Sequence, residues 1–168
     1  LDPVVDPLAA IAPGAPLVHD GFPNNVASDR RFRYGDPESA FATAPHRVSI
    51  DIAYPRNSCT PIETYGVIAE YNVNDGAYDI LATFQGPFSI HAVISRALKL
   101  PGNRVRLRTP PDSGGSFGVK QGVFPYIVLI SVAARVAGRP VKWIEDRLEH
   151  LSASNSATNR VTTLSAAV

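Results

Sequence analysis

The segment Gly114-Gly-Ser-Phe-Gly118 holds the densest group of residues that could do chemistry. Glycines permit a positive φ and let a ligand approach the backbone closely. Free N–H groups in such a loop, beside the start of a helix, form a nest for an anion. A tight turn between a strand and a helix uses the same residues, so the spacing leaves both interpretations open. The Walker phosphate-binding pattern and the G-x-G-x-x-G dinucleotide pattern are both absent.

The same five residues also fit G-x-S-x-G, the nucleophile elbow of serine hydrolases, with Ser116 as the nucleophile. An elbow needs a strand that runs directly into the serine and a helix that leaves directly from it. Here Pro110 and Pro111 separate the expected strand from Ser116. The downstream histidine, His150, follows Asp146 by only four residues, whereas hydrolases take acid and histidine from separate loops. Serine hydrolysis is therefore the weaker alternative.

The remaining titratable residues give no second site by their spacing. Four histidines lack the spacing of metal ligands: His19, His46, His91 and His150. The run Glu145-Asp-Arg-Leu-Glu149 could pair two carboxylates for acid–base work, but a surface turn with Arg147 between the acids is favoured. Cys59 is the only cysteine, which excludes an internal disulfide and indicates a structural role.

The composition is that of an ordinary globular domain. Of 168 residues, 45% are hydrophobic and 18% charged, with a net charge of +1. These values exclude bulk disorder and give no field that would attract a nucleic acid. No run approaches 18 uncharged apolar residues, and residues 1–3 lack signal-peptide features. We therefore expect no membrane span and a cytoplasmic location, with membrane association or the periplasm left open.

Periodicity predicts an α+β (mixed α/β) fold, a two-layer arrangement of a sheet with packed helices. Prolines punctuate residues 1–45, which read as an extended arm before a partial domain at 46–168. The predicted strands are 47–54, 66–71, 78–84, 104–108, 140–144 and 160–168, and the predicted helices are 89–100, 125–137 and 146–151. Ser89 is the expected N-cap of the first helix. The second helix is apolar nearly all round, which predicts burial. The last strand ends on an apolar residue without a turn, which suggests truncation.

Five segments, in this order, resemble one family: Pro61-Ile-Glu-Thr, Phe84-Gln-Gly-Pro, Leu100-Pro-Gly-Asn-Arg-Val-Arg, Gly114-Gly-Ser-Phe-Gly-Val-Lys, and Gly138-Arg-Pro-Val-Lys-Trp with Glu145-Asp-Arg-Leu-Glu. Together they resemble the molybdenum-cofactor-binding large subunit of the xanthine oxidase family, the molybdenum hydroxylases. The Arg-Pro-Val-Lys-Trp segment is similar to the bacterial branch of carbon-monoxide dehydrogenases and aldehyde oxidoreductases. The resemblance covers most of the chain and implies the first cofactor-binding subdomain.

The resemblance assigns roles to individual residues. It implies that Gln85 hydrogen-bonds an oxo ligand of the molybdenum, and that Phe117 lies near the metal without any direct protein ligand to it. The remaining cofactor contacts would be Gly114, Gly115, Ser116 and Gly118, where Ser116 replaces the third glycine of the family. Gln121 stands on the substrate side, where purine-oxidising members carry a glutamate. A substrate other than a purine is therefore expected.

The same resemblance implies an activity and its partners. The parent enzyme would hydroxylate an aldehyde, an N-heterocycle or a similar small molecule with oxygen from water. Its cofactor would be molybdenum in molybdopterin cytosine dinucleotide, with iron–sulfur clusters and FAD on partner subunits and the rest of the large subunit completing the pocket. The family's general base is expected beyond residue 168, so no catalytic residue is expected in this chain and the chain alone would be inactive. A non-catalytic piece that serves structure or subunit contact is the other alternative.

Overall fold

The computed structural model describes residues 3–168, and its internal contacts divide the chain into two compact units. One unit contains the chain up to Asn57 together with Thr158–Val168, and the other is Ser58–Ala157. The predicted division into an arm, 1–45, and a cofactor-binding domain, 46–168, stays a prediction.

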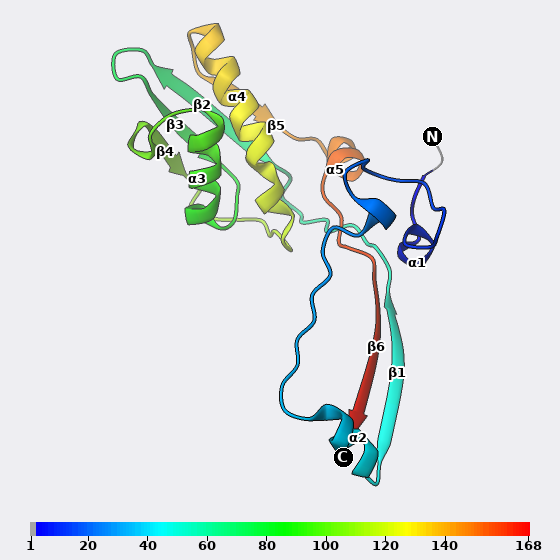
Figure 1. Ribbon diagram of the computed structural model, residues 1–168. Helices are drawn as coiled ribbons and strands as arrows, with labels where there is room; N and C mark the ends of the chain where they lie inside the picture. The colour runs from blue at the N-terminus through cyan, green and yellow to red at the C-terminus, as the bar shows by residue number, and fades with distance from the viewer. Residues whose placement is uncertain (1–2) are drawn as a thin grey trace. The chain divides into compact units, whose positions relative to one another are not determined.

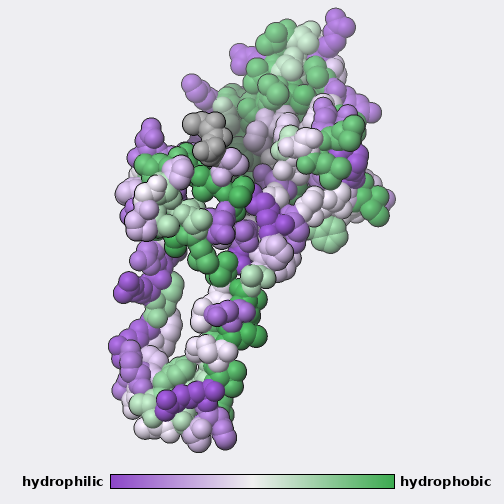
Figure 2. Space-filling model, turned by 90° about the vertical axis from the view of Figure 1, so that its right-hand side faces the viewer, coloured by the Kyte–Doolittle hydropathy of each residue, from purple (hydrophilic) through white to green (hydrophobic). Residues whose placement is uncertain are grey.

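The first unit is built on a two-stranded antiparallel ribbon (Figure 1). Its strands are β1 (Arg47–Tyr54) and β6 (Arg160–Ala167), with Ile50 opposite Leu164. Residues before β1 carry the short helices α1 (Pro7–Ala10) and α2 (Pro37–Thr43) and a 3-10 turn, η1 (Pro23–Asn25). The predicted arm is therefore interrupted by helical turns, each begun by a proline whose fixed φ suits the first helical position. The alternating apolar side chains of the ribbon are exposed, and Figure 2 shows hydrophobic residues along it.

The second unit holds a four-stranded sheet in the order β4-β3-β2-β5. The strands are β2 (Gly66–Asn72), β3 (Ala77–Ala82), β4 (Val105–Arg108) and β5 (Val141–Ile144). β2 runs antiparallel to β3 and β5, whereas β3 and β4 are parallel and are connected through a helix. Gly76, with φ 60°, supplies the left-handed residue in the turn between β2 and β3.

Two helices, α3 (Pro87–Ala97) and α4 (Phe124–Ala137), lie side by side over one face of this sheet (Figure 1). Alternate strand residues point toward them and form the core with Ile94 and Ile127: Val67, Ala69, Tyr78, Ile80 and Ala82. Shorter helical elements follow or precede the strands: η2 (Gly102–Arg104), η3 (Val119–Val123) and α5 (Arg147–Ala153). The predicted two-layer α+β fold is confirmed.

The prediction that the second long helix is buried nearly all round is wrong. Only one stripe of α4 faces the sheet, with Ile127, Ser131 and Ala134 buried, whereas Leu129 is 63% and Val136 82% exposed. By length and composition alone, the stretch Val119–Ala137 could cross a membrane. One stripe of this helix packs against β2 of the second unit.

The predicted cap of the first long helix is also wrong. Gly86 occupies the N-cap position of α3, and Pro87 begins the helix. Ser89 lies inside the first turn, where its Oγ donates to the carbonyl oxygen of Gly86 at 2.9 Å. The fixed φ of proline sets the start of the helix two residues before the position that the apolar spacing indicated.

Candidate functional site

Gln85 and the glycine loop come together in the second unit, although about thirty residues separate them. The hydroxyl of Ser116 donates to Oε1 of Gln85. The Gln121 side chain lies beside Gly86, since a Cβ added there would stand 3.4 Å from Gln121 Nε2. Three predicted site residues, Gln85, Ser116 and Gln121, are thus brought to one place.

The contact with Ser116 fixes the direction of the Gln85 amide. A hydroxyl that donates must face the carbonyl oxygen of the amide, so the NH₂ group takes the opposite side. Within residues 3–168, Gln85 Nε2 has no hydrogen-bond acceptor. The free donor therefore points away from Ser116 and is available to a ligand.

The loop presents further unused donors. Its backbone turns through left-handed conformations at Gly115 (φ 96°), Phe117 (φ 52°) and Gly118 (φ 93°). In the part of the chain that the structure describes, the N–H groups of these residues and of Ser116 donate to no acceptor. The Phe117 ring is 76% exposed, and the loop Gly114–Gly118 carries no ionisable side chain. The arrangement fits a ligand with anionic groups and a planar ring system.

Glu63 lies against the start and the end of this loop. Its N–H donates to the carbonyl oxygen of Gly114 at 3.2 Å, and the N–H of Gly114 donates to its carboxylate at 3.1 Å. A Cβ on Gly114 would stand 2.4 Å from Glu63 Cβ, so only glycine permits this approach. The same carboxylate pairs with Lys120 Nζ, whose side chain is 1% exposed.

Buried hydrogen bonds among Tyr65, Glu145 and His150 hold Val119, the residue that follows the loop. The Tyr65 hydroxyl donates to the carbonyl oxygen of Val119 at 2.7 Å. Glu145 accepts from the Tyr65 N–H at 3.1 Å and from His150 Nδ1 at 2.8 Å. Burial, and secondarily the negative charge of Glu145, raises the pKa of Tyr65 to about 12. The Tyr65 hydroxyl therefore stays protonated and keeps donating to the carbonyl oxygen of Val119, directly after the loop.

The hypothesis of a surface turn with ion pairs at 145–149 is wrong. Glu145 is 2% exposed and bonds to His150, while Arg147 donates to the carbonyl oxygens of Pro61 and Ile62 at 2.8 and 2.7 Å. Asp146 and Glu149 form a capping box at the start of α5 instead of an acid–base pair. The alternating burial of neighbouring residues, which sequence spacing does not reveal, decides these roles.

The nucleophile-elbow alternative finds no support in these contacts. The Ser116 proton is directed at Gln85 and not at a histidine, while its oxygen accepts from the Lys120 N–H at 3.3 Å. His150 is occupied with Glu145. A serine nucleophile needs a base within hydrogen-bond reach, which neither contact supplies.

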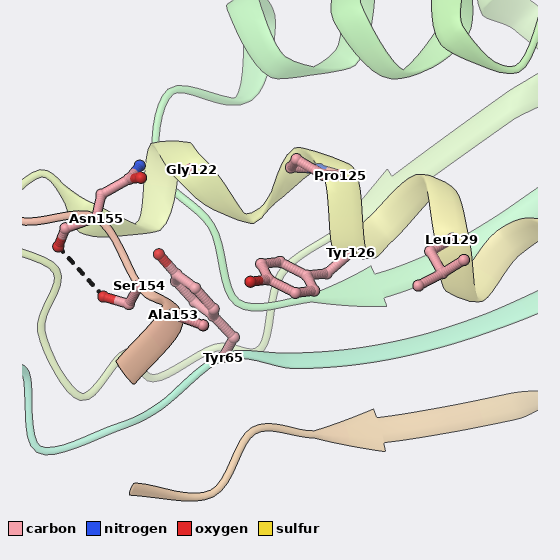
Figure 3. A pocket seen from close by; sticks show the side chains of 8 residues that line it. All are labelled: Tyr65, Gly122, Pro125, Tyr126, Leu129, Ala153, Ser154 and Asn155. Carbon is pink, nitrogen blue, oxygen red and sulfur yellow. Dashed lines mark hydrogen bonds between the residues drawn. The ribbon is translucent and has the colours of Figure 1, made fainter. Parts of the chain in front are cut away.

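A pocket of about 300 Å³ lies beside Tyr65 (Figure 3). It is lined by Tyr65, Gly122, Pro125, Tyr126, Leu129, Ala153, Ser154 and Asn155. The rings of Tyr65 and Tyr126 lie 5.8 Å apart, and Trp143 stacks on Tyr126 at 4.8 Å. None of the predicted site residues lines this pocket, so it forms a neighbouring feature and not the predicted site.

The other candidate residues have structural contacts. His91 Nε2 hydrogen-bonds the carbonyl oxygen of Val105 at 2.9 Å, and Cys59 is a half-buried free thiol that packs against the core. Among residues 3–168, no three histidine, cysteine or acidic side chains gather in a way that could hold a metal ion.

The sequence patterns did not reveal that four residues hold the loop: Glu63, Tyr65, Lys120 and Glu145. All four lie in or next to the segments that carried the family resemblance. Glu63 stands within Pro61-Ile-Glu-Thr, and that motif was the available signal. The role of Glu63 depends on contacts with Gly114 and Lys120, which lie 51 and 57 residues further along the chain. The motif does not specify these contacts.

Comparison with known proteins gives the family of this chain. Residues 18–168 match the molybdopterin cofactor-binding domain, and the chain belongs to this family. It is 35% identical to the carbon monoxide dehydrogenase large chain of Hydrogenophaga pseudoflava over 89% of its length, and 34% identical to the nicotine 6-hydroxylase large subunit of Paenarthrobacter nicotinovorans over 98%. In each case this chain spans 20% of the relative's length.

Solved structures agree with this assignment. CO dehydrogenase from Oligotropha carboxidovorans superimposes with a TM-score of 0.78 at 30% identity, covering 99% of this chain and 22% of that one. These relatives are named as a carbon monoxide dehydrogenase and a nicotine 6-hydroxylase, and the expected family is confirmed. The roles expected of the individual site residues stay predictions.

Proposed function

We propose that this chain is the part of a molybdenum hydroxylase large subunit in which Gln85 and the loop Gly114–Gly118 contact the molybdenum cofactor. The observation that carries the proposal is the Ser116–Gln85 hydrogen bond, which leaves the amide NH₂ free beside a loop with unused N–H donors. When bound, the cofactor supplies the redox chemistry of the hydroxylation. The chain's own residues bind and orient it.

Each group in the loop has a function that its chemistry allows. The Gln85 amide donates a hydrogen bond to the cofactor without adding charge. The N–H groups of Gly115 and Gly118 hold anionic pterin or phosphate oxygens, as backbone nests do. The exposed Phe117 ring covers one side of the bound group and excludes water from it. Ser116 orients the amide and takes no covalent part.

The substrate that we propose is an aldehyde, an N-heterocycle or a similar small molecule and not a purine. Gln121 is exposed and lies beside Gly86, next to Gln85 in the chain. A neutral amide donates and accepts, but it offers a purine no charged acceptor. A hydrogen bond to a charged group contributes about 1.5–3 kcal/mol against about 1 for a neutral pair, so purine selectivity is lower by about tenfold.

The proposed assembly follows the relatives. They are named as a large chain and a large subunit, which indicates complexes of several subunits. We place molybdopterin cytosine dinucleotide in this subunit, iron–sulfur clusters and FAD on partner subunits, and the complex in the bacterial cytoplasm. The general base belongs to the remaining part of the large subunit.

The experiment is purification of the full-length natural protein with its co-purifying subunits. Molybdenum is measured by mass spectrometry, the nucleotide released by acid is identified by chromatography, and xanthine is compared with aldehydes and N-heterocycles by kcat/KM. About one molybdenum per large subunit, released cytidine nucleotide and a preferred non-purine support the proposal.

Two results would overturn it. A metal-free complex without redox turnover would favour the structural alternative. Fluorophosphonate labelling that Ser116→Ala abolishes would favour the hydrolase. Xanthine as the best substrate would refute the substrate proposal alone.

A further inference from the structure

Glu63 is the point at which the glycine loop is tied to the sheet. It is two residues before Tyr65, whose N–H and carbonyl oxygen are bonded to Glu145 at 3.1 and 2.9 Å. Arg147 also holds the preceding carbonyl oxygens, those of Pro61 and Ile62. The backbone around Glu63 is therefore fixed from one side before it meets the loop.

The loop depends on Glu63 at both of its ends. Gly114 exchanges two hydrogen bonds with Glu63, through the backbone N–H and through the carboxylate. Lys120, at the other end, directs its ammonium group to the same carboxylate. Between these two anchors lie the left-handed residues Gly115, Phe117 and Gly118. Phe117, the non-glycine residue of the three, keeps a left-handed conformation only where its surroundings determine it.

The burial of Lys120 makes this pair asymmetric. The Lys120 side chain is 1% exposed, whereas that of Glu63 is 31% exposed. Neutralising Glu63 leaves a buried ammonium without a counter-charge, which is strongly unfavourable. Removing the lysine charge instead leaves a carboxylate that reaches solvent and still accepts from Gly114. The two substitutions must therefore differ in severity, and the second must relieve the first.

We propose that Glu63 is a positioning residue that fixes the conformation in which the loop Gly114–Gly118 receives the cofactor. It does so through its ion pair with the buried Lys120, which follows the loop. The inference rests on the proposed function for its cofactor part only. Glu63 contacts neither the Gln85 amide nor the free N–H groups, so it acts through the loop. Its loss changes how long the loop holds its conformation and, with it, how long the cofactor stays bound.

The test uses the full-length complex with four variants: Glu63→Gln, Lys120→Met, the double variant, and Glu70→Gln as control. Glu70 is an exposed glutamate on β2 of the same unit, so it undergoes the same chemical change away from the loop. Hydrogen–deuterium exchange is followed in peptides covering 112–120 and, as reference, β2 and β3. The half-life of molybdenum retention on mild heating is measured in parallel.

The expected order is specific. Glu63→Gln raises exchange of the hydrogen-bonded amides of this segment, those of Gly114, Val119 and Lys120, by about 10–100-fold, as expected for loss of hydrogen bonds to a charged group, with the sheet peptides unchanged. It shortens molybdenum retention by a similar factor, Lys120→Met has a smaller effect, and the double variant recovers toward Lys120→Met. Effects of the two substitutions that simply multiply would overturn the pairing.

Failure of this proposal is distinguishable from failure of the proposed function. If the natural complex holds no molybdenum, the proposed function fails, and the exchange data still test the positioning role. Loop exchange in Glu63→Gln equal to that in Glu70→Gln would overturn it. If Glu63→Gln does not fold, Lys120→Met provides the test instead. Its loop exchange must then exceed that of Glu70→Gln. Loop exchange equal to that of Glu70→Gln would overturn the positioning role.

Discussion

The substitution Gly114→Ala tests the close approach between the loop and Glu63. A Cβ at this position would lie 2.4 Å from Glu63 Cβ, and 3.2 and 3.3 Å from the Glu63 backbone N and Cα. These atoms are backbone or directly attached to it, so no side-chain rotation relieves the contact. Carbon atoms prefer about 3.5–4.0 Å, so the loop must move away from Glu63 by about 1 Å.

The magnitude follows from the bonds that such a movement breaks. Glu63 N–H to Gly114 O is 3.2 Å and Gly114 N–H to the Glu63 carboxylate is 3.1 Å, and both would exceed hydrogen-bond length. A neutral bond contributes about 1 kcal/mol and one to a charged group about 1.5–3 kcal/mol. We therefore expect local opening to become easier by about 2–4 kcal/mol.

Hydrogen–deuterium exchange of the Glu63 amide in the full-length protein measures this opening. At about 1.4 kcal/mol for each factor of ten, the expected acceleration is about 30–700-fold. Gly118→Ala is the matched control, since a Cβ there meets nothing within 4 Å and adds only the strain of a residue at φ 93°. An unchanged exchange rate of the Glu63 amide in Gly114→Ala would show that the loop does not depend on this close approach.

Three further outcomes are expected. In Tyr65→Phe, Val119 loses its buried donor and stability at neutral pH falls by about 1–3 kcal/mol. The pKa of Tyr65 is raised from 10.0 to about 12, so the contribution of Tyr65 to wild-type stability is intact below pH 10 and falls by about 1.4 kcal/mol per pH unit between those values. The gap between variant and wild type should therefore narrow in thermal unfolding above pH 10, and a constant gap would contradict it. Gln85→Ala in the parent enzyme should lower kcat by about 10–1000-fold with little change in KM, whereas a raised KM at unchanged kcat would show contact with substrate. Ser116→Gly, which frees the Gln85 amide, should lower kcat about fivefold, the value of one neutral hydrogen bond, and wild-type turnover would show that the amide is oriented otherwise.

Local patterns predicted the elements well. Period-two alternation of apolar and polar residues at 47–54 identified β1, although every residue of this strand is exposed in the structure. Gly138 ends α4 with φ 63°, the left-handed conformation that glycine supplies at helix ends. These features depend on residues close in the chain, which is why the sequence alone reveals them.

The site could be predicted only in part, because its support is long-range. Gln85 and Gly114–Gly118 came from a resemblance, and their proximity is a result of the topology that places the end of β3 beside the loop. The Glu63 contacts span 51 and 57 residues, and the Glu145 contact with Tyr65 spans 80. No periodicity encodes such pairs. The exposed side of α4 was not predicted either. The apolar composition of a helix does not tell which of its sides packs against the sheet.

The position of molybdenum in the full-length protein tests most directly whether Gln85 and the loop Gly114–Gly118 hold the cofactor. Crystals of the natural complex are measured on both sides of the molybdenum absorption edge, and the anomalous peak is located relative to the second unit. We predict a peak next to the Gln85 amide and the Phe117 ring, with the cofactor's anionic groups on the N–H donors of Gly115 and Gly118. A molybdenum-containing complex whose peak lies away from Gln85 and the loop would contradict it.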